Sequence, residues 1–318
     1  MKIIKVEQIH DNSMHLTWII NNICTNACSY CPKNLHTGTN HNYEWDNARK
    51  FFDYLFERYP EIHCSVAGGE PSVSPFLPEL IKIFHDRGHT IGITSNAAKP
   101  ARYWEEIAPN LAYISFSYHP EFPDPKFVEK AKIASENTTV TTRVMMHPKH
   151  WDHCVEIFEK LLKIDSITVE VVRIIDWGGG SDASASEYTP EQIQWFADNS
   201  LRSFEQRDKH YAPKFGDRLG HKLAANFHFD NGEVSNTKSV VSLINDGLTN
   251  FYGYECEIGL KSLFIDPDGV VLLGNCGLHG PIGHINDPDN IKWPSRSVIC
   301  TKTLCHCTTD VSINKWEM

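Results

Sequence analysis

The sequence lacks any long uninterrupted hydrophobic run. Its apolar stretches are far shorter than the ~20 residues that a membrane-spanning helix needs, so we expect no membrane partner. The first residues, Met1 to Glu7, show neither the apolar core nor the cleavage site of a secretory signal peptide. These absences predict a cytoplasmic protein.

Positive charge is also in short supply. The chain has 30 Lys and Arg against 40 Asp and Glu, which gives a formal net charge of −10. This excess of negative charge argues against binding of duplex DNA or long RNA through a broad electrostatic surface. It leaves room for a local basic channel and for a nucleotide-sized substrate. We also find no internal repeat, so a solenoid or propeller is not expected.

Cysteine, in contrast, is plentiful, with ten in 318 residues. Because we expect a reducing compartment, these residues are better interpreted as metal ligands than as a disulfide framework. Cys64 lies in a strand-like run and Cys154 in a helix-like one, so both are predicted to be packing residues. The other eight form one group near the N-terminus and one near the C-terminus.

The N-terminal group is a C-x3-C-x2-C loop that follows an apolar run at residues 16–20. Its members, Cys24, Cys28 and Cys31, can hold three corners of a cubane iron–sulfur cluster. His36 is the nearest candidate for a fourth ligand. If no protein group binds the fourth iron, that iron stays open to a small molecule, which is what a catalytic metal needs.

A second motif, Gly68-Gly69-Glu70, comes at the end of the next predicted strand. Two glycines let the backbone come close to a ligand, and a carboxylate can accept hydrogen bonds from an ammonium group. Taken alone, Gly-Gly-Glu is most often an ordinary turn.

Together the two motifs resemble the signature of radical S-adenosylmethionine (radical SAM) enzymes. The resemblance implies a [4Fe–4S] cluster on Cys24, Cys28 and Cys31, with S-adenosylmethionine chelating the open iron. One electron then cleaves the sulfonium to methionine and a 5′-deoxyadenosyl radical, which takes a hydrogen atom from substrate. The resemblance also places Tyr30 beside the adenine, and Gly68, Gly69 and Glu70 at the methionine amino group.

The resemblance implies further cofactor contacts at the ends of the third and fourth strands. The matching positions are Ser95, Asn96, Ser115 and Ser117. Arg143, in the fifth strand, either pairs with the methionine carboxylate or forms a structural salt bridge, because a buried arginine needs an anionic partner. An electron donor such as flavodoxin or ferredoxin is implied as a partner.

Strand-like and helix-like segments alternate along the first two thirds of the chain. This alternation predicts crossover units, a parallel sheet and chemistry in the loops after the strands. Six such units fit the partial (β/α)6 TIM-like barrel that the resemblance implies, and an open doubly wound sheet fits the bare pattern equally well. The strands are predicted at 16–20, 62–67, 90–94, 111–117, 138–146 and 167–175, and the helices at 45–59, 75–86, 101–107, 125–134, 151–162 and 189–207.

The rhythm changes after the sixth helix, which opens on a capping box at Thr189 to Gln192. Short antiparallel strands are predicted beyond it, at residues 226–229 and 262–266, with a turn at 230–232. We therefore predict two domains, a barrel at 1–211 and a small domain with β-hairpins at 212–318.

The C-terminal cysteines fall in this second domain. Their density resembles the auxiliary-cluster domains called Twitch and SPASM, although the spacing departs from the usual pattern. The resemblance implies a second [4Fe–4S] cluster on four of the five, and a four-cysteine zinc site is the alternative. The five cysteines are Cys256, Cys276, Cys300, Cys305 and Cys307.

The sequence therefore predicts a radical SAM enzyme whose substrate is a peptide or an amino-acid residue, or else another small molecule. Modification of a nucleotide, nucleobase or sugar is the alternative within the enzyme class. A non-catalytic iron–sulfur or zinc binding module is the alternative from another class, and it leaves Gly68-Gly69-Glu70 unexplained.

Overall fold

The computed structural model describes residues 1–9, 13–38, 43–174, 180–199, 225–236 and 240–318. The chain forms two compact units, each made of separate stretches of sequence. The first unit contains residues 1–19, 41–65 and 220–318, and the second contains residues 20–40 and 66–219. The domain boundary predicted at 211–212 lies outside the described residues and stays a prediction.

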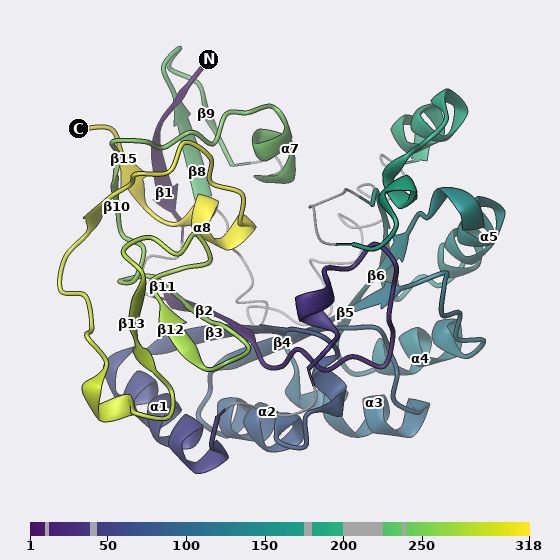
Figure 1. The fold of residues 1–318 in the computed structure, drawn as a ribbon, viewed down its shortest axis with the longest axis horizontal. Coiled ribbons are helices and arrows are strands. Elements are labelled where there is room, and N and C mark those ends of the chain that lie inside the picture. Colours follow the sequence, from purple (N-terminus) through teal and green to yellow (C-terminus); the bar gives the residue numbers. More distant parts are fainter. Residues whose placement is uncertain (10–12, 39–42, 175–179, 200–224, 237–239) are drawn as a thin grey trace. The chain divides into compact units, whose positions relative to one another are not determined.

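The second unit is built on four parallel strands that are neighbours in chain order, as expected when a helix follows each strand. In Figure 1 the helices follow one side of these strands. The strands are β4 (Thr90–Ser95), β5 (Tyr113–Tyr118), β6 (Thr139–Met145) and β7 (Ile167–Val172), and the helices are α2 (Leu77–Asp86), α3 (Ala101–Ile107), α4 (Phe127–Ala134) and α5 (Trp151–Leu161). Short 3-10 turns occur at η1 (Lys33–Leu35), η2 (Pro71–Val73), η3 (Ala108–Asn110), η4 (Pro148–His150) and η5 (Ala183–Ser186).

The two faces of this parallel sheet differ in chemistry. One face carries a fully buried apolar row at one register level: Ile93, Ile114, Val140 and Ile167. The helices pack on this face, since Trp104 of α3 contacts Phe116 of β5 at 4.8 Å between ring centroids. The opposite face carries hydroxyl and charged side chains: Thr94, Ser115, Ser117, Thr141, Arg143, Thr168 and Glu170.

A further helix begins at residue 190 and is described to residue 199. The predicted capping box is confirmed at its start. Thr189 N donates to Gln192 Oε1 at 3.0 Å, and Gln192 N donates back to Thr189 Oγ1 at 3.3 Å. Two of the otherwise unpaired N–H groups of the helix start are thereby satisfied.

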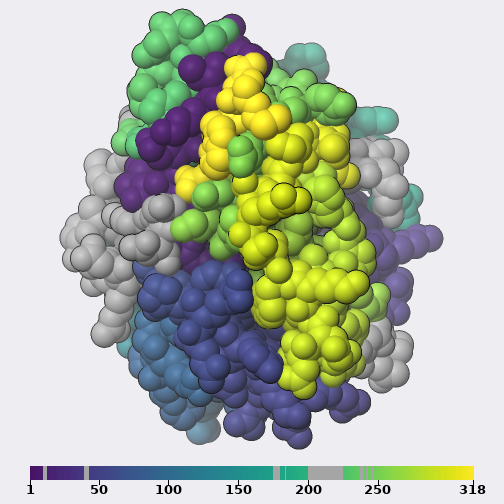
Figure 2. Space-filling model, turned by 90° about the vertical axis from the view of Figure 1, so that its left-hand side faces the viewer, coloured from purple at the N-terminus to yellow at the C-terminus, as the bar shows by residue number. Residues whose placement is uncertain are grey.

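The first unit contains a six-stranded antiparallel sheet that joins both ends of the chain. Its central strand β1 lies between β15 and β8, and Figure 2 shows the N-terminal residues against C-terminal ones. Tyr254 Oη donates to Ile3 O at 2.6 Å in the core beneath. The strands, in sheet order, are β14 (Val298–Ile299), β10 (Glu255–Cys256), β15 (Lys315–Trp316), β1 (Ile3–Gln8), β8 (Ala225–Phe229) and β9 (Val234–Ser235).

The first unit also holds the strand that leads into the cysteine loop. This strand, β2 (Ser13–Ile19), pairs in parallel with β11 (Ser262–Ile265). Trp18 of β2 packs against Phe52 of α1 at 5.4 Å between ring centroids. The remaining elements are α1 (Trp45–Arg58), β3 (Glu61–Ala67), which runs on into the second unit, β12 (Val270–Leu272), β13 (Pro281–His284), α7 (Val240–Asn245), η7 (Pro288–Asn290) and α8 (Thr308–Ser312).

Most predicted elements are found within two or three residues of their expected ends. The prediction missed β1 altogether, and it described β11 only as antiparallel, whereas β11 pairs antiparallel with β12 and parallel with β2. None of the helices in the described part of the chain combines the length and the apolar character that a membrane crossing needs.

Candidate active site

The cysteine loop lies where β2 and β3 end. Backbone hydrogen bonds join the two strand ends: Ile20 N donates to Ala67 O at 2.9 Å, and Gly69 N donates to Asn21 O at 2.9 Å. Glu70 N donates to Ile23 O at 2.7 Å. The loop that begins at Cys24 therefore starts beside the Gly-Gly-Glu motif, as the prediction that both follow strands requires.

The two glycines are needed because backbone passes close by. A Cβ on Gly68, whose φ is 145°, would lie 2.5 Å from Asn21 O. A Cβ on Gly69 would lie 2.3 Å from Ile23 O. Any side chain would push the cysteine loop away, so the glycines bring the two loops together.

The Glu70 side chain is fully buried. Its Oε1 accepts hydrogen bonds from Ser72 N at 2.9 Å and Ser95 Oγ at 2.7 Å. Its Oε2 accepts from Asn96 N at 2.7 Å. Burial raises the pKa of this carboxyl, and the three donors oppose that rise. The carboxylate thus connects the Gly-Gly-Glu loop to the end of β4.

The three cysteines of this loop are free thiols, with Cys28 buried and Cys24 and Cys31 partly buried. Burial, together with the charges of Glu121, Cys31 and Cys24, raises the pKa of Cys28 to about 12. Burial also raises the pKa of Cys24 and of Cys31. Each of these cysteines lies within four residues of the next, on one short loop.

This donor set fits a cubane cluster. Among the described residues, no three His, Cys, Asp or Glu side chains are placed to hold a single metal ion. A cubane attaches each thiolate to a different iron, so its ligands need not converge on one point. The Cys24 sulfur also accepts from Asn26 N at 3.4 Å, a contact that suits a thiolate ligand. The ring Nε2 of His36 lies 3.4 Å from the Cys31 carbonyl oxygen.

Tyr30 points toward the loops after β5 and β6. Its hydroxyl forms a hydrogen bond with His119 Nδ1 at 2.7 Å, and its ring stacks on the His119 ring. Burial lowers the pKa of His119 to about 4, so the ring is neutral and its Nδ1 can accept. The Tyr30 ring also packs against His147 at 5.8 Å between centroids.

Glu121 is a residue of this site that the sequence reasoning missed. Its carboxylate accepts from Ser29 N at 2.7 Å and from Ser29 Oγ, and it lies 3.3 Å from His147 Nε2. Ser29 lies between Cys28 and Cys31, so Glu121 holds the cysteine loop from the end of β5. The signal for it was slight, a carboxylate four residues after a predicted strand.

A third loop contacts the cysteine loop from the end of β7. Ser181 N and Asp182 N both donate to Ser29 O, at 2.6 and 3.1 Å. A Cβ on Gly180 would lie 2.8 Å from Ser29 O, so only glycine fits this approach. The cysteine loop is thus held by the loops that follow three strands, β3, β5 and β7.

The remaining predicted cofactor residues lie on the second unit's strands. Ser95 and Asn96 bind Glu70 as described, and the buried Ser115 hydroxyl has no hydrogen-bond partner among the described residues. Ser117 lies on the same face of β5, two residues closer to the end of the strand. Beside it, Arg143 Nε donates to Glu170 Oε2 at 2.9 Å, with both side chains partly exposed. This ion pair is the structural alternative considered for Arg143.

Four of the five C-terminal cysteines are electrostatically coupled. Burial, together with the charges of Asp310, Cys256 and Cys300, raises the pKa of Cys276 to about 12. Burial likewise raises the pKa of Cys305, which couples to Cys256 and Cys276. Burial and the charge of Asp310 raise the pKa of Cys307, and a hydrogen bond with the Asn275 side chain lowers it.

A buried cation acts on two of these four cysteines. Lys315 is 1% exposed, and its Nζ donates to three carbonyl oxygens, those of Asp310, Val311 and Ile313, at 2.6 to 2.9 Å. Its charge lowers the pKa of Cys256 and Cys305, against the larger effect of burial. Positive charge is therefore available to stabilise thiolates here.

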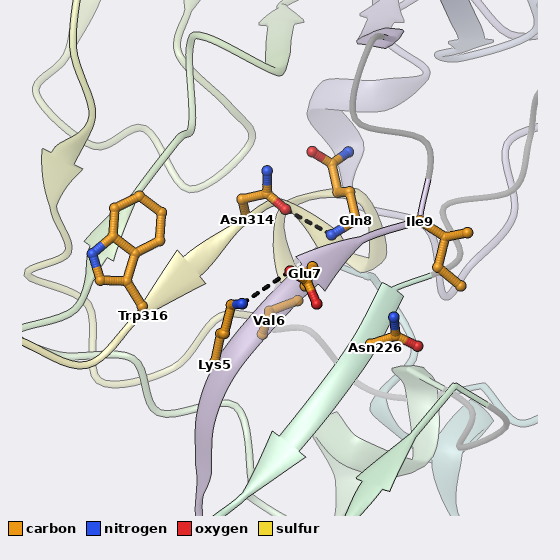
Figure 3. Close-up of a pocket in the computed structure, with 8 residues that line it drawn as sticks. All are labelled: Lys5, Val6, Glu7, Gln8, Ile9, Asn226, Asn314 and Trp316. Carbon is orange, nitrogen blue, oxygen red and sulfur yellow. Dashed lines mark hydrogen bonds and ion pairs between the residues drawn. The ribbon is translucent and has the colours of Figure 1, made fainter.

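A pocket of about 420 Å³ lies on the antiparallel sheet of the first unit (Figure 3). It contains none of the predicted site residues. Its lining is a mixture of polar and apolar side chains, Lys5, Val6, Glu7, Gln8, Ile9, Asn226, Asn314 and Trp316.

Comparison with solved structures shows a shared fold. SuiB from Streptococcus suis, bound to S-adenosylmethionine, has a TM-score of 0.55 at 13% identity, covering 89% of this chain and 66% of its own. The enzyme anSMEcpe, with bound AdoMet and the Kp18Cys peptide, has a TM-score of 0.52 at 12% identity, covering 86% of this chain and 78% of its own. The predicted partial α/β barrel is thereby confirmed.

Among curated proteins, the S-adenosyl-L-methionine-dependent tRNA 4-demethylwyosine synthase of Methanocaldococcus jannaschii is 40% identical over 67 residues. The match spans about a fifth of each protein, 21% of this chain and 20% of the synthase. The Radical SAM superfamily model matches residues 18–176, which include the cysteine loop and the Gly-Gly-Glu motif and make up half of the chain. The predicted family is confirmed: this protein belongs to the radical SAM superfamily.

Proposed function

We propose that this enzyme cleaves S-adenosylmethionine reductively and uses the resulting radical to take a hydrogen atom from a bound substrate. The observation that carries the proposal is the trio of free thiols beside the Gly-Gly-Glu loop, in a chain of this family. A [4Fe–4S] cluster on Cys24, Cys28 and Cys31 would supply one electron to the sulfonium. A flavodoxin or ferredoxin would be its electron donor.

The chain's own residues would bind and orient the cofactor. Gly68 and Gly69 have no side chains at the place where the methionine amino group is expected to bind. Because Glu70 is buried and bonded to three internal donors, we propose that it acts by holding this loop in place. The His36 ring is directed at the Cys31 carbonyl, which supports a fourth corner left for S-adenosylmethionine. Tyr30 is proposed to line the adenine site.

Other proposed contacts follow the strand ends. For the ribose and the carboxylate of S-adenosylmethionine, the proposed contacts stay Ser95, Asn96, Ser115 and Ser117. Arg143 would pair with the methionine carboxylate only if its guanidinium bound that carboxylate and Glu170 at the same time. We therefore favour the ion pair as its main role.

For the substrate we propose a peptide or an amino-acid residue. The second unit's polar sheet face offers hydroxyls and an Arg143–Glu170 pair, which can bind amide and charged groups together. SuiB is also known bound to precursor peptide SuiA, and anSMEcpe with bound peptides. Both observations support a peptide without identifying it.

A nucleobase is the second candidate. The stretch of 40% identity to the tRNA 4-demethylwyosine synthase favours it. The net charge of −10 argues against a long nucleic acid, though not against a nucleotide-sized substrate. A mass-spectrometric screen of peptides and of nucleosides, with and without S-adenosylmethionine, decides between the two classes by which one changes mass.

We further propose that residues 212–318 form a Twitch-like domain with one auxiliary [4Fe–4S] cluster. The coupling among Cys256, Cys276, Cys300 and Cys305 supports these four as ligands, with Cys307 left over. The buried Lys315 supports a negatively charged group at this place.

The radical chemistry is tested by anaerobic reconstitution with iron and sulfide. With S-adenosylmethionine and dithionite, the wild-type enzyme should form 5′-deoxyadenosine. Cys28→Ala should abolish it, whereas Cys64→Ala, a buried thiol outside both groups, should retain it. A wild-type enzyme that binds iron but forms no 5′-deoxyadenosine would be a binding module instead.

The auxiliary cluster is tested by metal analysis. We expect about eight irons per chain in the wild type and about four after replacement of Cys256 and Cys276 by alanine, since each cubane holds four. Replacement of Cys307 should leave the count near eight. Zinc in place of the second set of irons would defeat the auxiliary cluster and leave the first cluster intact.

A further inference from the structure

The sulfur of Cys24 has a second hydrogen-bond donor that comes from a different strand. Asn96 Nδ2 lies 3.7 Å from Cys24 Sγ, and Asn26 N lies 3.4 Å from the same sulfur. Sulfur acceptors bond at longer distances than oxygen because the atom is larger. Asn96 comes directly after β4. The contact therefore joins the loop after β4 to the cysteine loop.

The orientation of the Asn96 amide is set by its other partners. Its Oδ1 accepts from Ala98 N at 3.0 Å, so the oxygen end is fixed. Its Nδ2 also donates to Thr25 Oγ1 at 3.0 Å. An amide nitrogen has two hydrogens, and these contacts direct one at Thr25 and one at Cys24.

The backbone around Asn96 is held in an uncommon conformation. Ala97 has a φ of 60°, in the left-handed region, although it has a side chain and is fully buried. Ala97 N donates to Ser95 Oγ at 3.0 Å, and Ala97 O accepts from the buried Lys130 Nζ at 2.7 Å. Lys130 is itself paired with Asp124. Such a conformation persists only where its surroundings fix it.

Glu70 completes the attachment. Its Oε2 accepts from Asn96 N at 2.7 Å, and its Oε1 accepts from Ser95 Oγ at 2.7 Å. The Asn96 main chain and side chain are therefore both fixed before any cofactor binds. This fixed arrangement directs the Asn96 amide at Thr25 and Cys24 of the cysteine loop.

We propose that Asn96 is a positioning residue that donates an N–H···S hydrogen bond to Cys24 and thereby sets the reduction potential of the cluster. Hydrogen bonds to ligand sulfurs favour the reduced cluster because it carries more negative charge on its sulfurs. The bond therefore raises the potential and eases electron entry. The inference rests on the proposed function, because a cluster must bind to the three thiols.

The test is a potentiometric titration of the reconstituted enzyme, followed by the electron paramagnetic resonance signal of the reduced cluster. S-adenosylmethionine is left out, so that a role of Asn96 in binding it does not enter. Asn96→Asp keeps an oxygen for Ala98 N but removes the donor, and Asn96→Leu removes the donor without adding charge. Thr25→Val is the matched control, because it removes the other partner of Nδ2 and leaves the sulfur contact.

At the wild-type midpoint potential, we expect the ratio of reduced to oxidised cluster to fall roughly threefold to tenfold in both Asn96 variants, a range set by the net worth of one hydrogen bond. Thr25→Val should stay at the wild-type ratio. If Asn96→Leu fails to assemble its cluster, Asn96→Asp with a wild-type iron count gives the answer.

Unchanged potentials in the Asn96 variants, with normal iron content, would overturn the inference and leave the proposed function standing. A wild-type enzyme that assembles no cluster in the cysteine loop overturns both. The iron count of the wild type, compared with that of Cys28→Ala, distinguishes these two results, because only a cluster in the cysteine loop is lost in that variant.

Discussion

The imidazole of His119 lies between Tyr30 and the interior of the second unit. Its Nδ1 is hydrogen-bonded to the Tyr30 hydroxyl at 2.7 Å, and burial lowers its pKa to about 4 from an ordinary value of 6.5. A single buried ring thus ties the aromatic residue of the cysteine motif to the loop after β5.

Because the folded pKa of His119 is depressed, the unfolded chain binds more protons between pH 6.5 and 4, and stability falls as the pH is lowered through this window. The full effect is at most about 3 kcal/mol. Urea unfolding under anaerobic conditions at pH 7 and pH 5 measures it. His119→Gln should lose less stability than the wild type, and the exposed His85→Gln should match the wild type. Equal losses in all three would contradict this assignment.

At the scale of elements, the loops that follow β3, β5 and β7 act together on the cysteine loop. Gly69 N and Glu70 N bond to its start, and Glu121 and Ser181 bond to Ser29 at its centre. Loops at the ends of parallel strands meet at one edge of the sheet, which is why residues distant in sequence can hold one short loop. These contacts orient the ligands.

Glu121→Ala should lower the rate of 5′-deoxyadenosine formation by roughly 10–100-fold, the usual cost of losing a partner that orients a metal ligand. Glu121→Gln keeps one acceptor oxygen for Ser29 and should lose less. Glu136→Ala, an exposed carboxylate beyond α4, is the control and should match the wild type. The rate is measured by chromatography at equal iron content. A Glu121→Ala enzyme with a wild-type rate would show that Ser29 is held well enough without it.

At the scale of the whole molecule, the first and last strands belong to one sheet. β1 lies between β8 and β15, with Ile3 buried beneath Tyr254 and Ile4 on the other face, 37% exposed. The sheet therefore forms only when the N-terminal strand inserts between segments from the other end of the chain. Such pairing closes a very long loop, which makes β1 sensitive to small changes.

Ile3→Asp places an unpaired charge in this core and should destabilise the first unit by roughly 3 kcal/mol or more. Ile4→Asp, one residue along and on the exposed face, should cost far less. Hydrogen exchange followed by mass spectrometry distinguishes them, since amides of β8 and β15 should exchange faster in Ile3→Asp while those of β4 to β7 keep their protection. Similar exchange in both variants would contradict the central place of β1.

The sequence by itself determined the cysteine loop, the Gly-Gly-Glu motif and the alternation of strands and helices. These are local patterns: the spacing of Cys24, Cys28 and Cys31 lies within eight residues, and helical or strand periodicity lies within one element. The family followed from such patterns, and the comparisons confirmed it.

Only the tertiary structure decided which groups surround these motifs. Glu121 meets Ser29 across 92 residues, and Asn96 meets Cys24 across 72. Neither pairing leaves a periodic signal, because it depends on which loops the parallel strands bring to the same edge. The insertion of β1, the burial of Glu70 and the coupling of four of the five C-terminal cysteines arise in the same way. Local spacing determines which secondary structure and which ligand set a segment can form. The packing of distant segments determines which of its side-chain atoms contact other groups and which remain available for binding.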